Sequence, residues 1–101
     1  MAVWECDVSK KFQTSVSKNV VWEAFPEVIS EAMEHMCMNP IEGTCLIYMF
    51  DPMEEVCHII TDADVHLAAL AHYLYEVDIL FRTQKNLRTG CIRDIRRVVI
   101  T

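Results

Sequence analysis

The chain has 101 residues, 52% of them hydrophobic, and a formal net charge of −6. This length predicts a single domain spanning residues 1–101, and two glycines and three prolines leave little room for linkers or low-complexity segments. The negative charge disfavours a domain that binds nucleic acid by overall attraction. The apolar share is high for a small protein, so we expect part of the surface to be covered in a homo-oligomer.

The N-terminal part of the chain begins with a strand signal. Apolar and acidic residues alternate over residues 4–8, which is the period of a half-buried strand. A weaker alternation over residues 12–16 predicts a second arm, so an N-terminal hairpin is expected.

The next element is predicted to be an amphipathic helix. Apolar residues recur at helical spacing between Val21 and Met36, and glutamates lie on the opposite side. The helix is expected to begin near Glu23, with Pro26 in its first turn, or to follow a short turn. It should end at Asn39, because a residue that precedes proline avoids the helical region.

A hairpin and a second helix follow in the prediction. The apolar residues 45–50 read as a central strand, Asp51 and Pro52 as a turn, and residues 56–60 as the partner strand. Thr61 gives a capping-box-like start to a second helix that reaches Lys85 and is apolar on most sides. After Gly90, residues 92–100 read as a closing strand.

Taken in order, these elements predict an α+β fold. The expected architecture is a two-layer antiparallel sheet with two helices on one face. Its βαββαβ order is that of ferredoxin-like folds, with an extra strand from the N-terminal hairpin.

Charge is strongly segregated along the chain. The segment 19–81 holds twelve of the fifteen acidic residues and no lysine or arginine. A charged surface implies a partner of opposite charge. The predicted partner-binding residues are the glutamates of the first helix and of the hairpin turn: Glu23, Glu27, Glu31, Glu34, Glu54 and Glu55.

The leading functional hypothesis is a small, acidic, non-enzymatic interaction protein. It would act as an oligomeric inhibitor or regulator of a basic macromolecular partner, for example in the manner of phage anti-defence proteins or nucleic-acid mimics. Solvation of an ordinary helix face is the simpler reading of the same glutamates. An alternative function is a ferredoxin-like regulatory module that binds a small molecule.

Two further surfaces are predicted from the C-terminal half. A second helix that is apolar on most sides should be buried on more than one side, so we expect Tyr73, Tyr75 and Ile79 to anchor the oligomer interface. The cations after residue 81 are an alternative nucleic-acid contact, although no aromatic residues are interleaved with them for base stacking. These cations are Arg82, Lys85, Arg88, Arg93, Arg96 and Arg97.

No motif predicts catalysis, a cofactor or a metal centre. The sequence has no glycine-rich phosphate loop, nucleophile elbow or zinc-protease motif. Five widely spaced cysteines fit reduced thiols that pack as small hydrophobic residues in a cytoplasmic protein. Neither a signal peptide nor a membrane-spanning segment is expected.

Overall fold

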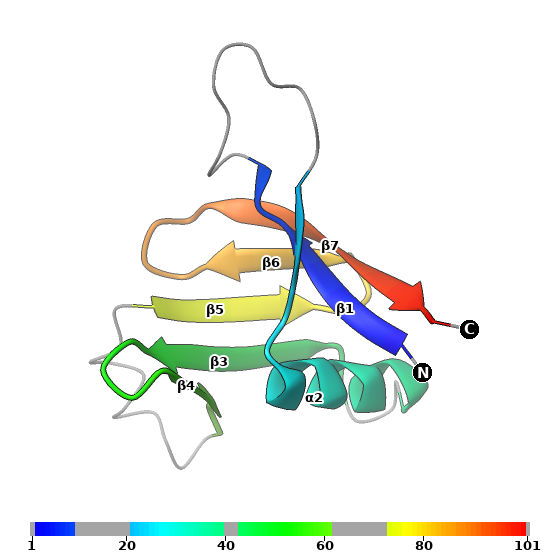
Figure 1. Cartoon of the computed structure of the whole chain (residues 1–101), viewed down its shortest axis with the longest axis horizontal. Coiled ribbons are helices and arrows are strands. Elements are labelled where there is room, and N and C mark those ends of the chain that lie inside the picture. Colours follow the sequence, from blue (N-terminus) through cyan, green and yellow to red (C-terminus); the bar gives the residue numbers. More distant parts are fainter. Residues whose placement is uncertain (1, 10–20, 40–42, 62–72, 101) are drawn as a thin grey trace.

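The computed structural model describes residues 2–9, 21–39, 43–61 and 73–100. In this part of the chain there are seven strands and one helix (Figure 1). In chain order they are β1 (Ala2–Asp7), β2 (Trp22–Ala24), α2 (Glu27–Met38), β3 (Cys45–Asp51), β4 (Val56–Ile59), β5 (Tyr73–Asp78), β6 (Thr83–Asn86) and β7 (Ile92–Val99).

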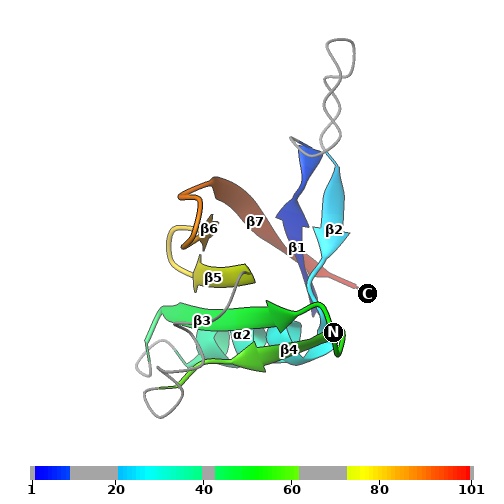
Figure 2. The ribbon, with the colours of Figure 1, turned by 90° about the vertical axis from the view of Figure 1, so that its left-hand side faces the viewer.

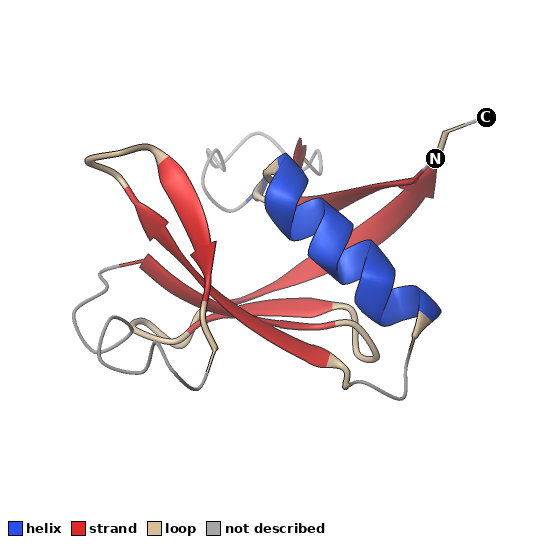
Figure 3. Cartoon of the chain, turned by 90° about the horizontal axis from the view of Figure 1, so that it is seen from below, coloured by secondary structure: helices blue, strands red, loops and turns tan. Residues whose placement is uncertain are grey.

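The strands form one antiparallel sheet in the order β2-β1-β7-β6-β5-β3-β4. The sheet curls into a half-barrel, and Figure 2 shows the β1–β2 end and the β3–β4 end turning toward each other. Helix α2 lies across the strands (Figure 3) and contacts β1 and β4. We call the side of the sheet that faces α2 the concave face and the opposite side the convex face.

The core lies between the concave face and α2. Four side chains are almost completely buried there: Trp4, Ile29, Met33 and Val77. The sheet contributes side chains to this core from alternate positions of its strands, since every second residue points to the same face. The core therefore brings the first strand, the helix and the middle of the sheet into one cluster.

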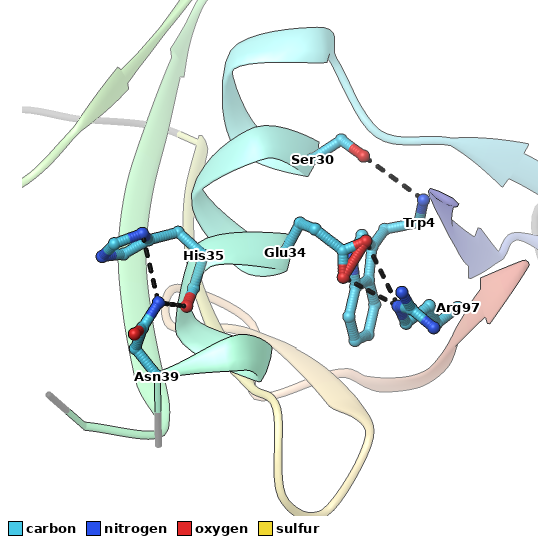
Figure 4. Close-up of polar contacts among 6 residues, drawn as sticks. All are labelled: Trp4, Ser30, Glu34, His35, Asn39 and Arg97. Atoms are coloured by element: carbon cyan, nitrogen blue, oxygen red, sulfur yellow. Dashed lines mark hydrogen bonds and ion pairs between the residues drawn. The ribbon is translucent and has the colours of Figure 1, made fainter. Parts of the chain in front are cut away.

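Polar contacts fix the helix on the sheet (Figure 4). The Ser30 hydroxyl accepts a hydrogen bond from the backbone N–H of Trp4 at 3.3 Å. Arg97 Nε donates to both carboxylate oxygens of Glu34, at 2.7 and 3.2 Å. At the helix C-terminus, Asn39 donates from its backbone N–H and its side chain to the carbonyl of His35, at 3.0 and 2.9 Å. The last turn is therefore closed by the residue that precedes Pro40.

The ferredoxin-like expectation is wrong: the fold is mostly β, with one described helix and a single curled sheet. The error lies in residues 73–86, which form β5, a turn and β6 instead of the end of a second helix. Apolar residues occur on both faces of β5, and this mixture satisfies a helical stripe as well as a strand. The predicted start of that helix and the predicted strand 12–16 lie outside the described residues.

Strand β2 is not predicted by the sequence, since the first helix is expected to begin near Glu23, within this strand, or to follow a short turn. The helix itself begins at Glu27, directly after Pro26. Proline lacks the N–H that a helix interior would need, so the chain enters the helix from an extended conformation at this residue. The strands expected at residues 4–8, 45–50, 56–60 and 92–100 are all present within one or two residues.

Candidate functional site: a cleft on the concave face

An open cleft of about 670 Å³ occupies the part of the concave face that α2 leaves uncovered. No residue of α2 lines it, whereas Phe25 and Pro26, just before the helix, lie on its rim. Its remaining lining comes from the strands and the turns between them: Cys6, Val8, Glu23, Ala24, Tyr48, Phe50, Pro52, Cys57, Tyr73, Tyr75, Gln84, Asn86, Thr89, Cys91 and Arg93. The cleft exists because a helix of twelve residues is too short to cover the whole half-barrel.

Aromatic rings form one side of the cleft. Tyr48 and Tyr75 are direct neighbours across β3 and β5, and their rings stack with centroids 5.2 Å apart. Phe25 meets Tyr48 edge-on at 6.4 Å. The next pair along the same strands, Phe50 and Tyr73, is also edge-on, at 6.1 Å. Cross-strand pairing thus builds a continuous aromatic cluster, in which Phe25 and Tyr48 are buried and Tyr75, Phe50 and Tyr73 are partly exposed.

The floor of the cleft is polar. The Tyr48 hydroxyl donates to Oε1 of Gln84 at 2.7 Å, and both side chains are more than nine-tenths buried. Burial raises the pKa of Tyr48 well above its usual value, so its hydroxyl remains a donor at neutral pH. Gln84 pairs with Arg93 across β6 and β7. Arg93 is half-buried and forms no hydrogen bond or ion pair in the described part of the chain.

The hydrogen-bond acceptors beside Arg93 are already occupied. Asn86 Oδ1 accepts the backbone N–H groups of Arg88 and Thr89, at 2.9 and 3.2 Å. Thr89 Oγ1 accepts the N–H of Cys91 at 3.3 Å. These bonds hold the turn between β6 and β7, in which Gly90 takes a φ of 77°.

Two of the thiols in the cleft, those of Cys6 and Cys57, are not activated. Burial raises the pKa of Cys6 to about 11, although the nearby Arg93 acts in the opposite direction. Burial also raises the pKa of Cys57. Because the thiolate is the reactive form, neither cysteine is a good nucleophile at neutral pH. All five cysteines are free.

The predicted partner-binding glutamates do not form one surface. Glu23 lies on β2 and lines the cleft. Glu27 and Glu31 are exposed on α2, while Glu34 is paired with Arg97. Glu54 and Glu55 are exposed in the turn between β3 and β4.

The cations of the predicted nucleic-acid contact are also dispersed. Arg82 lies over the ring of Trp4, with 4.6 Å between its guanidinium carbon and the ring centroid. Arg96 is 2.7 Å from Glu5. Lys85 and Arg88 are exposed, and Lys85 lies on the convex face, one position from the concave-facing Gln84. Arg93 lies in the cleft, and Arg97 on β7 is paired with Glu34 of α2, so these side chains point in several directions.

The residues predicted for an oligomer interface lie elsewhere than expected. Tyr73 and Tyr75 line the cleft, and Ile79 is 7% exposed in the core. The prediction that they lie on the outer side of a helix is wrong, because Tyr73 and Tyr75 belong to strand β5 and Ile79 lies in the turn that follows it. Oligomerisation itself stays a prediction.

A cluster at the β3–β4 hairpin was not anticipated. Ligand atoms of Asp51, Glu54 and His58 lie within 4.8 Å of one another. Asp51 Oδ1 already accepts the backbone N–H groups of Met53 and Glu54, at 2.9 and 3.4 Å. This arrangement is that of an ordinary turn, and exposed groups of this kind are common in proteins without a metal.

Comparisons with protein-family models, with curated proteins and with solved structures gave no match. Among the described residues, no helix is long and apolar enough to cross a membrane. The cleft combines aromatic surface with polar groups that have no partner within the described part of the chain, and the aromatic alternation of β3 and β5 is the sequence signal that could have located it.

Proposed function

We propose that the protein is a non-enzymatic binding module that holds a small, largely apolar molecule in the cleft. The observation that carries the proposal is the partly exposed aromatic surface of Tyr75, Phe50 and Tyr73, which is backed by the buried ring of Tyr48. Ligand sites of proteins are concavities of about 300–1,000 Å³ with aromatic walls and a few polar groups, and the cleft has this size and composition. The elevated pKa of Cys6 supports a role without covalent catalysis.

The test uses a neutral fluorescent probe, N-phenyl-1-naphthylamine, whose emission rises in an apolar site. The matched pair of variants is Phe50→Ala and Met49→Ala. These residues are neighbours on β3 that point to opposite faces, and both are partly exposed. Loss of the ring in Phe50→Ala should weaken probe binding roughly three- to tenfold, since an aromatic pair contributes about 0.5–1.5 kcal/mol beyond area burial. Met49→Ala should bind the probe as the unaltered protein does.

Absence of probe binding by the unaltered protein, or equal losses in the two variants, would refute the proposal. Circular dichroism spectra and melting curves establish that both variants are folded.

A second candidate function is the engagement of a basic protein partner. It is favoured by one observation: Glu27 and Glu31 are exposed, one helical turn apart, and form no ion pair within the described residues. The double variant Glu27→Lys/Glu31→Lys should no longer capture a partner that the unaltered protein captures. The control variant Asp94→Lys, which changes an exposed acid on the sheet, should still capture it. Retention by both variants would exclude this surface.

A further inference from the structure

We infer that the ligand of the cleft is a small aromatic carboxylate, whose negative charge is bound by Arg93. This inference rests on the proposed function and specifies its ligand. It follows from three observations: the charge of Arg93, the donors beside it, and the position of the aromatic rings.

The first observation concerns the charge of Arg93. Arg93 is half-buried in the cleft and makes no ion pair in the described residues, whereas Arg96 and Arg97 on the same strand are each paired with a glutamate. Removing a charge from water is unfavourable unless it is paired. A guanidinium has five N–H donors in a fixed plane, and this geometry matches a carboxylate with two parallel hydrogen bonds.

The second observation is the buried amide beside it. Gln84 is 8% exposed, and its carbonyl oxygen is held by the Tyr48 hydroxyl. The Nε2 donors of Gln84 have no partner in the described part of the molecule and are not among its buried unpaired atoms, so they are accessible from the cleft, where Gln84 lies directly opposite Arg93 in the ladder. An amide donor that is accessible in the cleft next to a cation favours an anionic acceptor over a neutral apolar group.

The third observation sets the rest of the ligand. The charge of Arg93 lies close enough to the hydroxyl of Tyr75 to lower its pKa, against the larger effect of burial. A carboxylate on Arg93 would thus be next to the stacked pair Tyr48 and Tyr75, and an attached ring would extend along this surface toward Phe50. The volume of about 670 Å³ suits a small molecule.

One acidic group among the residues that line the cleft opposes this assignment, and Asp7 and Asp94, outside the lining, also act on the Cys6 thiol that Arg93 affects. Glu23 lies on β2 at the edge of the cleft, and its charge acts on the same thiol, Cys6, as that of Arg93. Glu23 is exposed, so water screens much of its charge, whereas Arg93 is half-buried. The variant Glu23→Gln should therefore bind a carboxylate somewhat more tightly than the unaltered protein.

The test compares three naphthalene compounds of similar size as competitors of the neutral probe. They are 2-naphthoate, 2-naphthamide and 2-naphthylmethylammonium, which carry a negative, no and a positive charge. We expect 2-naphthoate to compete at a concentration roughly tenfold or more below that of the amide, as charge-assisted hydrogen bonds allow.

The variants are Arg93→Met and, as the matched control, Lys85→Met. Both changes remove one positive charge, from the concave face and the convex face respectively. Arg93→Met should lose the preference for 2-naphthoate over 2-naphthamide, each measured against the probe bound to the same variant, while Lys85→Met should keep that preference.

The outcomes separate the two proposals. If the probe binds but the three compounds compete equally, if the ammonium compound competes best, or if Arg93→Met keeps the preference for 2-naphthoate, the inference is overturned and the cleft remains a binding site. If the probe does not bind the unaltered protein, the proposed function fails and the inference fails with it.

Discussion

The hydrogen bond between Tyr48 and Gln84 provides a quantitative test of the floor of the cleft. Tyr48→Phe keeps the ring that stacks on Tyr75 and removes only the hydroxyl, which donates to Gln84 at 2.7 Å. Both partners are more than nine-tenths buried, so the Gln84 carbonyl loses its partner without free access to water. A buried polar group left in this way costs about 1–3 kcal/mol, which is roughly 4–24 °C in melting temperature for a domain of this size.

The assay is urea unfolding of a double-mutant cycle made of Tyr48→Phe, Gln84→Leu and the double variant. Each single variant leaves one buried polar group unpaired, whereas the double variant leaves none. We therefore expect the double variant to be more stable than the sum of the single effects predicts, with a coupling of about 1–2 kcal/mol. Strictly additive effects, or single effects below about 0.5 kcal/mol, would refute a buried hydrogen bond at this place.

Three other predictions concern the core, the thiols and the ion pair. Met33→Ala should lower the free energy of unfolding by about 2–5 kcal/mol, because Met33 is fully buried. Met38 is exposed on the same helix, so Met38→Ala should lower it by less than about 0.5 kcal/mol. Urea unfolding measures both values, and similar losses would contradict the burial pattern. The raised pKa of Cys6 stabilises the fold fully below about pH 9, and this contribution falls as the pH rises through the folded-state pKa of about 11. In thermal melts from pH 8 to pH 11, the melting temperature of the unaltered protein should fall more steeply than that of Cys6→Ala. Parallel curves would count against the assignment. Glu34→Gln should lower the melting temperature and reduce its dependence on salt, because the ion pair with Arg97 is lost; an unchanged salt dependence would show that this pair contributes nothing.

The strands with a clear boundary signal could be predicted from the sequence. Pro52 and Gly90 mark turns, and the apolar segments that border these turns fit strands. The turn between β5 and β6 has no such signal, because the left-handed conformation there is taken by Arg82, with a φ of 58°, and not by glycine. Asp78 stabilises this turn by accepting the N–H of Phe81 at 3.0 Å. Without a glycine or proline, the segment reads as an uninterrupted helix.

The charges illustrate a second limit. Sequence order separates Glu34 from Arg97 by 63 positions, and only the fold brings α2 next to the end of β7. The same holds for the cleft, since Tyr48, Gln84 and Arg93 come from three strands. The alternation within each strand indicates which residues share a face, but the register between strands decides which of them meet.

The most direct test of the central claim is a nuclear magnetic resonance measurement of contacts between the protein and bound N-phenyl-1-naphthylamine. Occupation of the cleft predicts intermolecular nuclear Overhauser effects from the probe to the ring protons of Tyr73, Tyr75 and Phe50, and none to the methyl groups of Ile47 and Met49 on the convex face. Contacts to the convex face alone, or contacts spread over both faces of the sheet, would contradict the account.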